Sequence, residues 1–229
     1  VHLGALESVV EQLGLELIKV VAEPYAVARS IAGEQLGQSG ALFIDVGGGT
    51  TDVALVRSGS VEGTRMFALG GRAFSKSLAD RLDVSFDEAE RVKIEHAVGG
   101  ELEDAEEVAE IIGEDIAVWA AGVELVLEEF GHEGLLPGRI ELCGGGAALP
   151  EIRAALEADG FASGLPFARR PQISMMEPDA VSEINDDTGL LVDQQDVTPM
   201  ALAYQPVEAA APQEPLDAAL ARELKGMRV

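Results

Sequence analysis

Apolar side chains recur along this chain with two different periods, and each change of period predicts a boundary between a helix and a strand. Residues 3–13 carry them at helical spacing up to Gly14, a residue type that commonly ends helices. Residues 15–21 then alternate as in a strand, which Pro24 breaks. The alanine-rich run 25–36 predicts another helix, so the chain is expected to open as helix, strand and helix.

Three short strands are predicted next, over residues 42–46, 51–57 and 60–68. The first two are joined by three glycines and the next two by "SGS", which is typical of a hairpin. Because strands joined by such short connections pair antiparallel, we expect a meander.

The middle of the chain is predicted to be helical. One helix covers residues 71–82, and Ser85 begins another with a capping box. Residues 101–110 hold six acids, which indicates a solvated helix face. Apolar residues spaced alternately by four and three follow, either in the same helix or in a neighbour, and predict a buried stripe that includes Trp119 and Phe130.

The last third of the chain is expected to hold less regular structure. A strand is predicted at 139–143, followed by the turn "GGGAALP" and a helix over 151–159. Irregular segments then lead to a short closing helix at 196–204. Residues 205–215 have the composition of a linker, and residues 216–229 form either a fraying tail or a short amphipathic helix.

Composition and charge narrow the class of protein. The 229 residues include 41 acidic and 16 basic ones, a formal charge of -25, so the surface would repel a phosphate backbone and nucleic acid is not an expected partner. Neither a membrane span nor a signal peptide is evident, and the single cysteine, Cys143, cannot form an internal disulfide, which predicts an intracellular protein. The start at Val1, directly in a helical pattern, indicates a fragment of a longer protein or a processed chain.

The stretch "IDVGGGTTDVAL" carries the main chemical signal. It matches neither the P-loop nor the dinucleotide-binding fingerprint, because the strand pattern resumes directly after its glycines. A hairpin built on Gly47, Gly48 and Gly49 leaves backbone N–H groups uncovered, and the Thr50 and Thr51 hydroxyls add donors. Such a concave row of donors is suited to phosphate oxygens.

Asp45 ends its strand beside these donors. Its carboxylate would repel a phosphate unless a cation lay between them, which predicts Mg²⁺ held at Asp45 mostly through water. Asp52 either shares that role or caps the turn. The alternative is a tight glycine hairpin with no ligand.

A second glycine turn follows a later strand and opens a helix. Gly144, Gly145 and Gly146 would let a flat base or a ribose approach the backbone closely, although a plain glycine entry to a helix has the same pattern. Glu90 and Lys93 lie three apart on one helix face, so they either reach a ribose hydroxyl pair or form a surface ion pair.

Five motifs together resemble the second half of actin-like ATPases: "AEPYAVA", "IDVGGGTTDVALV", "LGGRAFSKSLADRL", "AERVK" and "ELCGGGAALP". The chain is most similar to the bacterial cell-division protein FtsA and the pilus-assembly protein PilM, and more loosely to MreB and the Hsp70 ATPase domain. The resemblance covers residues 1 to about 205 and implies an α/β, ribonuclease H-like fold with a mixed sheet. It implies that residues 1–36 end a first lobe and its connecting helix, that 37–205 form the second lobe with a helical subdomain inserted at about 84–135, and that 206–229 are linker and flexible tail.

The same resemblance assigns roles to single residues. "DVGGGTTD" would be the second phosphate loop, with Asp45 active in catalysis, and "CGGGAALP", which includes Ala147, would be the adenosine loop. Glu23 would position the attacking water or the metal, and Glu90 and Lys93 would meet the ribose of ATP. The family's first phosphate loop is expected in a preceding half of the protein, so this chain alone should bind nucleotide weakly.

The resulting hypothesis is an ATP-binding actin-like scaffold of the cell-division or type IV pilus machinery, in which the nucleotide acts as a conformational and polymer switch. Its expected partners are a tubulin-like division-ring protein or pilus inner-membrane proteins, together with further copies of the chain. Its expected place is the cytoplasm, at the inner face of the membrane, with only weak or indirect membrane association. Slow ATP hydrolysis is left open. The alternatives are an Hsp70-like or sugar-kinase-like ATPase or phosphotransferase, and a degenerate homologue that binds partners without nucleotide.

Overall fold

The computed structural model of the chain describes residues 3–31, 40–58, 60–181 and 184–210. The chain divides into two compact units, one of Val1–Lys19 with Gln205–Val229, the other of Val20–Tyr204. The first unit contains helix α1 (Leu3–Gln12), which confirms the predicted opening helix, although none of its described side chains is buried. The second unit contains the sheet and every candidate site residue.

The strand predicted over residues 15–21 is wrong. These residues have no helix or strand assignment, and Leu15 and Ile18 are 63% and 75% exposed. A strand needs a neighbour whose backbone groups satisfy its own, and no strand in the described part of the chain pairs with this segment. Alternation of apolar residues alone therefore does not make a strand here.

Within the described residues, five strands form one mixed sheet in the order β3-β2-β1-β4-β5. The predicted meander of β1 (Ala41–Val46), β2 (Thr51–Arg57) and β3 (Ser60–Phe67) is antiparallel, and β4 (Arg139–Cys143) lies parallel to β1. The sequence pattern missed β5 (Gln172–Met175), which pairs parallel with β4. This edge strand has four residues, of which only Ile173 is buried, so it lacks a clear apolar alternation.

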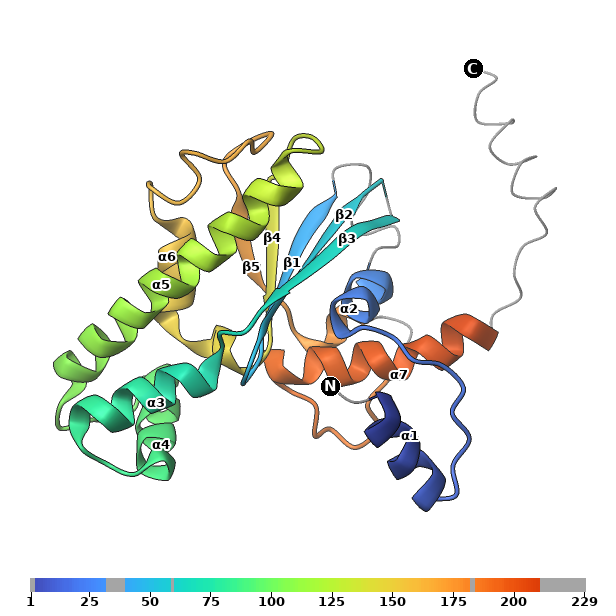
Figure 1. The fold of residues 1–229 in the computed structure, drawn as a ribbon, viewed down its shortest axis with the longest axis horizontal. Coiled ribbons are helices and arrows are strands. Elements are labelled where there is room, and N and C mark those ends of the chain that lie inside the picture. The colour runs from blue at the N-terminus through green and yellow to red at the C-terminus, as the bar shows by residue number, and fades with distance from the viewer. Residues whose placement is uncertain (1–2, 32–39, 59, 182–183, 211–229) are drawn as a thin grey trace. The chain divides into compact units, whose positions relative to one another are not determined.

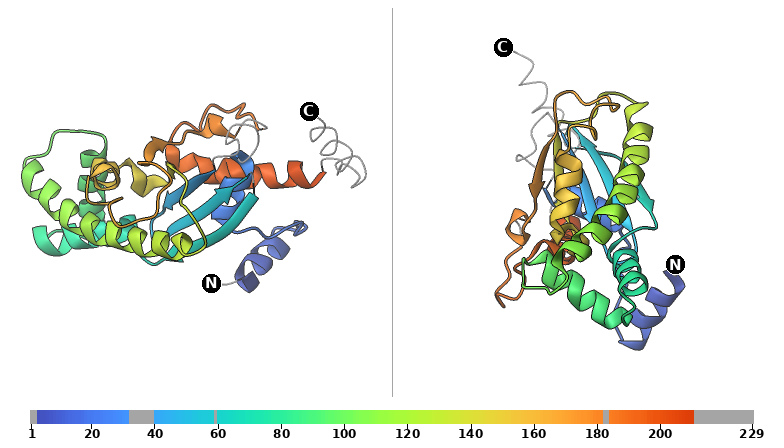
Figure 2. Two further views of the ribbon diagram at one scale, coloured as in Figure 1. Left: turned by 90° about the horizontal axis from the view of Figure 1, so that it is seen from above. Right: turned by 90° about the vertical axis from the view of Figure 1, so that its left-hand side faces the viewer.

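Helices cover both faces of the sheet (Figures 1 and 2). One face packs against α5 (Ala105–Gly131) and α6 (Pro150–Glu157), and α3 (Gly71–Leu82) packs on α5 beyond the end of the sheet (Figure 1). The other face packs against α2 (Glu23–Ile31) and residues 197–204 of α7 (Val197–Ala210). Strand β1 serves both layers, because its successive side chains point to opposite faces. Leu42 and Ile44 belong to the α5 core, whereas Ala41 and Phe43 belong to the α2 and α7 core.

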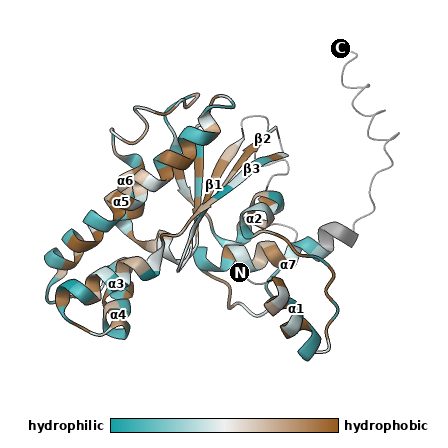
Figure 3. Ribbon diagram, in the orientation of Figure 1, coloured by the Kyte–Doolittle hydropathy of each residue, from teal (hydrophilic) through white to brown (hydrophobic). Residues whose placement is uncertain are grey.

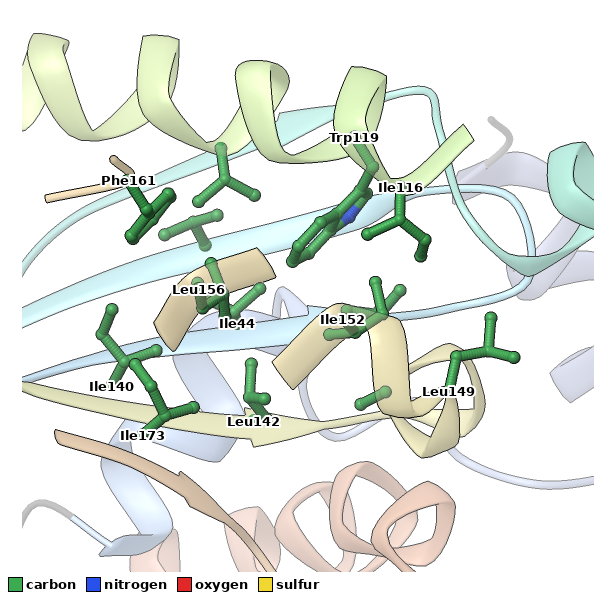
Figure 4. Packing of buried hydrophobic residues seen from close by; sticks show 14 of the residues in the cluster. Ile44, Ile116, Trp119, Ile140, Leu142, Leu149, Ile152, Leu156, Phe161 and Ile173 are labelled. Atoms are coloured by element: carbon green, nitrogen blue, oxygen red, sulfur yellow. The ribbon is translucent and has the colours of Figure 1, made fainter. Parts of the chain in front are cut away.

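Trp119 lies at the centre of the larger core, fully buried as the sequence predicted (Figure 4). It projects from α5 toward Ile44 and Ile152, and Phe130 is also buried on this helix. The helix begins at Ala105 and continues through Gly113, so the second half of the acidic run shares one element with the apolar stripe, with a polar and an apolar side (Figure 3). Residues 101–104 precede the helix, so the predicted helical face is wrong for them. Burial of the apolar stripe on the sheet stabilises the long helix.

Two helix boundaries differ from the prediction, and one agrees with it. Helix α2 begins at Glu23, with Pro24 in its first turn, where a missing N–H costs nothing; the predicted end at residue 36 lies outside the described residues. Helix α4 (Phe86–Ala97) begins as predicted, with the Ser85 hydroxyl accepting a hydrogen bond from Glu88 N at 3.2 Å. Helix α7 runs to Ala210, so the linker prediction is wrong for residues 205–210, and residues 211–229 lie outside the described part.

Candidate nucleotide site

Two glycine turns meet at the carboxyl edge of β1 and β4. These strands run parallel with Asp45 opposite Cys143, so each strand delivers the turn that follows it to the same edge. An added Cβ at Gly144 would lie 2.2 Å from Asp45 Oδ1, and one at Gly146 would lie 2.6 Å from Val46 Cγ1. The two turns therefore lie beside each other, at the edge where α/β sheets usually place ligands.

The first turn is a tight loop over residues 47–50. Gly47 N donates to the Thr50 carbonyl at 2.9 Å. Among the described residues, the amides of Gly48 and Gly49 have no acceptor, and nothing lies within 4 Å of the position of a Cβ on Gly49. Two uncovered amides beside open space form a small anion-binding surface.

The amino end of α3 holds this loop. Gly71 N donates to the Gly47 carbonyl at 2.9 Å, and Arg72 N donates to the Gly48 carbonyl at 2.7 Å. The first N–H groups of a helix have no partner within the helix, so these two find theirs in the turn. A Cβ on Gly70 would lie 2.5 Å from the Gly47 carbonyl oxygen, which explains why paired glycines begin this helix.

The two threonines of the turn differ in environment. Thr51 is buried, and its hydroxyl donates to the Leu69 carbonyl at 2.8 Å while accepting from Trp119 Nε1 at 2.8 Å. The hydroxyl is thus used inside the core, contrary to the expectation that it would add a donor for a ligand. Thr50 is half-buried and donates to Asp52 Oδ2 at 3.0 Å, so it remains at the edge of the site.

Asp45 is held by a residue far away in the sequence. Thr198 Oγ1, in the first turn of α7, donates to Asp45 Oδ2 at 2.6 Å. Burial raises the pKa of the Asp45 carboxyl above its ordinary value, while hydrogen bonds from Thr198 and Cys143 oppose that shift. The surroundings of Asp45 therefore disfavour the ionised form of its carboxyl, and a nearby cation would offset that cost.

Glu23 and Asp52 add to this negative charge. Asp52 lies directly opposite Asp45 on β2. Burial raises the pKa of both carboxyls; the charge of Asp45 adds to each shift, and at Glu23 that of Asp52 does too. Both side chains line a hollow of about 460 Å³ together with Thr50 and Arg65. A larger hollow of about 600 Å³, lined by residues from 156 to 171, contains none of these carboxylates.

The protein donors fit a hydrated cation better than a fully coordinated one. In the described part of the chain, no three His, Cys, Asp or Glu side chains are placed to hold a metal ion together. Asp45 is one carboxylate that lies beside amides suited to phosphate. Mg²⁺ commonly keeps several waters and binds through one or two carboxylates plus substrate phosphates, which agrees with this donor set.

Glu90 and Lys93 lie together on α4 as predicted, yet they are not a surface pair. Lys93 is buried, and its Nζ donates to Glu90 Oε2 at 2.8 Å. Burial alone would raise the pKa of Glu90, but hydrogen bonds from Lys93 and Ser75, with the charges of Lys93 and Arg72, outweigh it and leave the pKa lowered. Glu90 remains ionised and partly exposed, whereas Lys93 faces inward.

The second turn offers one open residue. Gly144 has φ +86°, a left-handed conformation that favours glycine, and its N–H donates to the Gln194 carbonyl at 3.0 Å. Gly146 and Ala147 are buried, the latter in the α5 core. Gly145 is exposed at the start of the short 3₁₀ helix Gly145–Ala148, so a flat ligand would meet the turn there.

Comparison with known families identifies the family to which this chain belongs. Residues 42–187, more than half of the chain, match the family model described as cell division protein FtsA. The chain belongs to the FtsA family. It is 31% identical over 189 residues to the cell division protein FtsA of Bacillus subtilis, covering 74% of this chain and 42% of the relative. The ethanolamine utilization protein EutJ of Escherichia coli is 36% identical over 126 residues, covering 50% of this chain and 43% of the relative. This FtsA-family chain thus spans less than half the length of these relatives.

Solved structures confirm the predicted fold. The PilM–PilN type IV pilus biogenesis complex matches with a TM-score of 0.68 at 19% identity, covering 89% of this chain and 58% of the other. MreB5 of Spiroplasma citri bound to ADP matches with a TM-score of 0.61 at 19% identity, covering 89% and 64%. At these identities the matches show the fold alone, an actin-like ATPase fold with a mixed sheet.

Sequence reasoning missed Thr198, Gln194 and Arg72 as site residues of this FtsA-family chain. Thr198 contacts Asp45 across 153 positions, and the Gln194 carbonyl accepts from Gly144 N across 50 positions. No local pattern links such distant residues; the position of Thr198 at the start of a predicted helix was the only signal.

Among the helices of the described segments, none is long and apolar enough to cross a membrane.

Proposed function

We propose that the chain binds Mg²⁺-ATP at the shared edge of the two glycine turns, as the second lobe of an actin-like scaffold. The observation that carries the proposal is the contact between the turns, with the Asp45 carboxylate at their junction beside Gly144. The amides of Gly48 and Gly49 would bind phosphate, and Gly145 would lie against the nucleoside. Glu90 would remain available to a ribose hydroxyl at the exposed side of α4.

The role of the nucleotide would be that of a conformational and polymer switch. A ligand shifts a conformational equilibrium only if it binds one state better than the other, and a site built from two separate turns meets that condition when a second lobe closes on it. Residues 37–205 would form the second lobe, with residues 84–135 as its inserted helical part. Partners would be division-ring or pilus membrane proteins and further copies of the chain, at the inner face of the membrane.

Hydrolysis would be slow and would depend on Glu23. Its raised pKa and its place in the hollow beside Asp52 support a role in positioning an attacking water. Retention of ATP binding with loss of turnover in Glu23→Gln would support this assignment.

A calorimetric titration with ATP, with and without Mg²⁺, tests the proposal. We expect binding that requires Mg²⁺ and that Asp45→Ala weakens at least about tenfold, an effect the size of a lost charge-assisted interaction. Asp80→Ala, on the exposed side of α3, is the matched control and should bind as the parent chain does. Equal Mg²⁺ dependence of ATP binding in Asp45→Ala and the parent chain would show that Asp45 takes no part in holding the cation.

A further inference from the structure

Lys93 is a buried cation whose donors are all used inside the protein. Its side chain is 10% exposed, and its Nζ donates to Glu90 Oε2 at 2.8 Å, Ser75 Oγ at 2.8 Å and the Gly71 carbonyl at 3.0 Å. An ammonium group has three N–H donors, so this arrangement leaves none for a ligand. The geometry differs from that expected of a residue that contacts a ribose.

The contacts of Lys93 converge on the amino end of α3, the same helix end that holds the glycine hairpin. The Gly71 carbonyl accepts from Lys93, while Gly71 N donates to the Gly47 carbonyl at 2.9 Å. Arg72 N donates to the Gly48 carbonyl at 2.7 Å. A short chain of hydrogen bonds therefore runs from α4 through α3 to the hairpin.

Because the peptide group is planar, these contacts also set the direction of the Gly48 and Gly49 N–H groups, which are proposed to bind phosphate. In a trans peptide the C=O of one residue and the N–H of the next point in opposite directions within one plane. Since the Gly47 and Gly48 carbonyls point to α3, the N–H groups of Gly48 and Gly49 must point away from it. The position of the α3 amino end thus sets the direction of both uncovered amides.

We propose that Lys93 is a positioning residue: it fixes the amino end of α3 and so aims the amides of Gly48 and Gly49 at phosphate, without contacting the nucleoside. Its effect on nucleotide affinity rests on the function proposed above; its effect on the hairpin does not. A buried ammonium paired with Glu90 is suited to this task, because moving it would leave the Lys93 charge buried without its partners.

Amide hydrogen exchange in the chain without ligand tests the positioning directly. In Lys93→Met we expect exchange at Gly47, Gly71 and Arg72 to accelerate at least about tenfold, while core amides of α5 keep their protection. Arg91→Met is the matched control, since Arg91 forms an exposed i,i+3 pair with Glu88 on the same helix. Unchanged exchange at the three amides, or equal acceleration throughout the fold, would overturn the proposal.

Ser75→Ala provides a second variant if Lys93→Met does not fold. It removes one acceptor of Lys93 together with the hydrogen bond from the Ser75 hydroxyl to the Gly71 carbonyl at 3.0 Å, while Lys93 still pairs with Glu90. Because the other contacts of Lys93 remain, the same three amides should accelerate by a smaller factor. The absence of any change in this variant would count against the proposal.

Ligand selectivity separates positioning from direct contact. Lys93→Met should weaken ADP and ATP at least about tenfold and leave adenosine affinity unchanged, since only the phosphates meet the hairpin. An equal loss for adenosine would mean that Lys93 touches the nucleoside. If the parent chain binds none of these ligands, the proposed function fails, while the exchange experiment still decides the role of Lys93.

Discussion

Thr198 Oγ1 donates a 2.6 Å hydrogen bond to Asp45 Oδ2, which joins the start of α7 to the end of β1 across 153 residues. This bond opposes the effect of burial on the Asp45 carboxyl and keeps one of its oxygens in a defined direction. A carboxylate that organises a hydrated cation must be both ionised and oriented. Thr198 contributes to each requirement, and α7 thereby becomes part of the candidate site.

Removal of the Thr198 hydroxyl should impair Mg²⁺-dependent binding. In Thr198→Val the pKa of Asp45 should rise further, because a hydrogen bond that lowers it is lost. We expect ATP affinity in the presence of Mg²⁺ to fall about tenfold, the size of one charge-assisted hydrogen bond, in calorimetric titration. Thr198→Ser keeps the hydroxyl and should bind like the parent chain; equal affinity of all three chains would contradict the assignment.

The ionised Asp45 carboxylate should lower the free energy of unfolding at neutral pH. Its pKa is raised in the folded state, so between the ordinary and the raised pKa the folded chain binds more protons than the unfolded chain. Stability therefore falls as pH rises through that window and stays reduced above it. We expect Asp45→Asn to have a higher free energy of unfolding than the parent chain at pH 7 in urea titrations, and this gain should shrink as the pH is lowered through the raised pKa.

The matched control for that measurement is Asp80→Asn, a change on the exposed side of α3. It should alter stability by no more than about 0.5 kcal/mol, as surface substitutions usually do. If Asp45→Asn proved less stable than the parent chain at pH 7, burial would not be the main influence on Asp45.

Adjacent glycines in the second turn should respond very differently to an added methyl group. At Gly144, φ is +86° and a Cβ would lie 2.2 Å from Asp45 Oδ1 and 2.6 Å from the Val46 carbonyl oxygen, so Gly144→Ala should lower the free energy of unfolding by at least about 2 kcal/mol. At Gly145 the nearest atom would be 3.7 Å away, and Gly145→Ala should leave stability nearly unchanged. Thermal unfolding of the two variants gives the comparison; similar losses in both would contradict it.

Thr51 should act on stability through its place in the core. Thr51→Val leaves Trp119 Nε1 and the Leu69 carbonyl without the partner that they share, which should cost about 1–3 kcal/mol in the free energy of unfolding. Thr51→Ser retains the hydroxyl and should lose less. Urea titration of both variants measures the difference, and a Thr51→Val chain as stable as the parent chain would show that the hydroxyl is dispensable.

The sequence by itself determined the elements whose signal is local. The α5 stripe around Trp119, the glycine hairpin and the Ser85 cap follow from periodicity, turn chemistry and capping between near neighbours. The five ordered motifs also pointed to the actin-like fold. Residues 15–21 and the strand β5 show the limit of this reasoning, since a strand exists only where another strand satisfies its backbone.

Only the tertiary structure decided which atoms of the candidate site are available. Thr51 and Lys93 stand in the motifs as plausible ligand contacts, yet their polar atoms are bound to Trp119, Gly71 and other protein groups. Thr198 lies outside every motif, yet it holds Asp45. The reason is physical: hydrogen-bond satisfaction in a buried site depends on groups that folding brings together from distant positions, and the spacing of residues along the chain carries no information about those contacts.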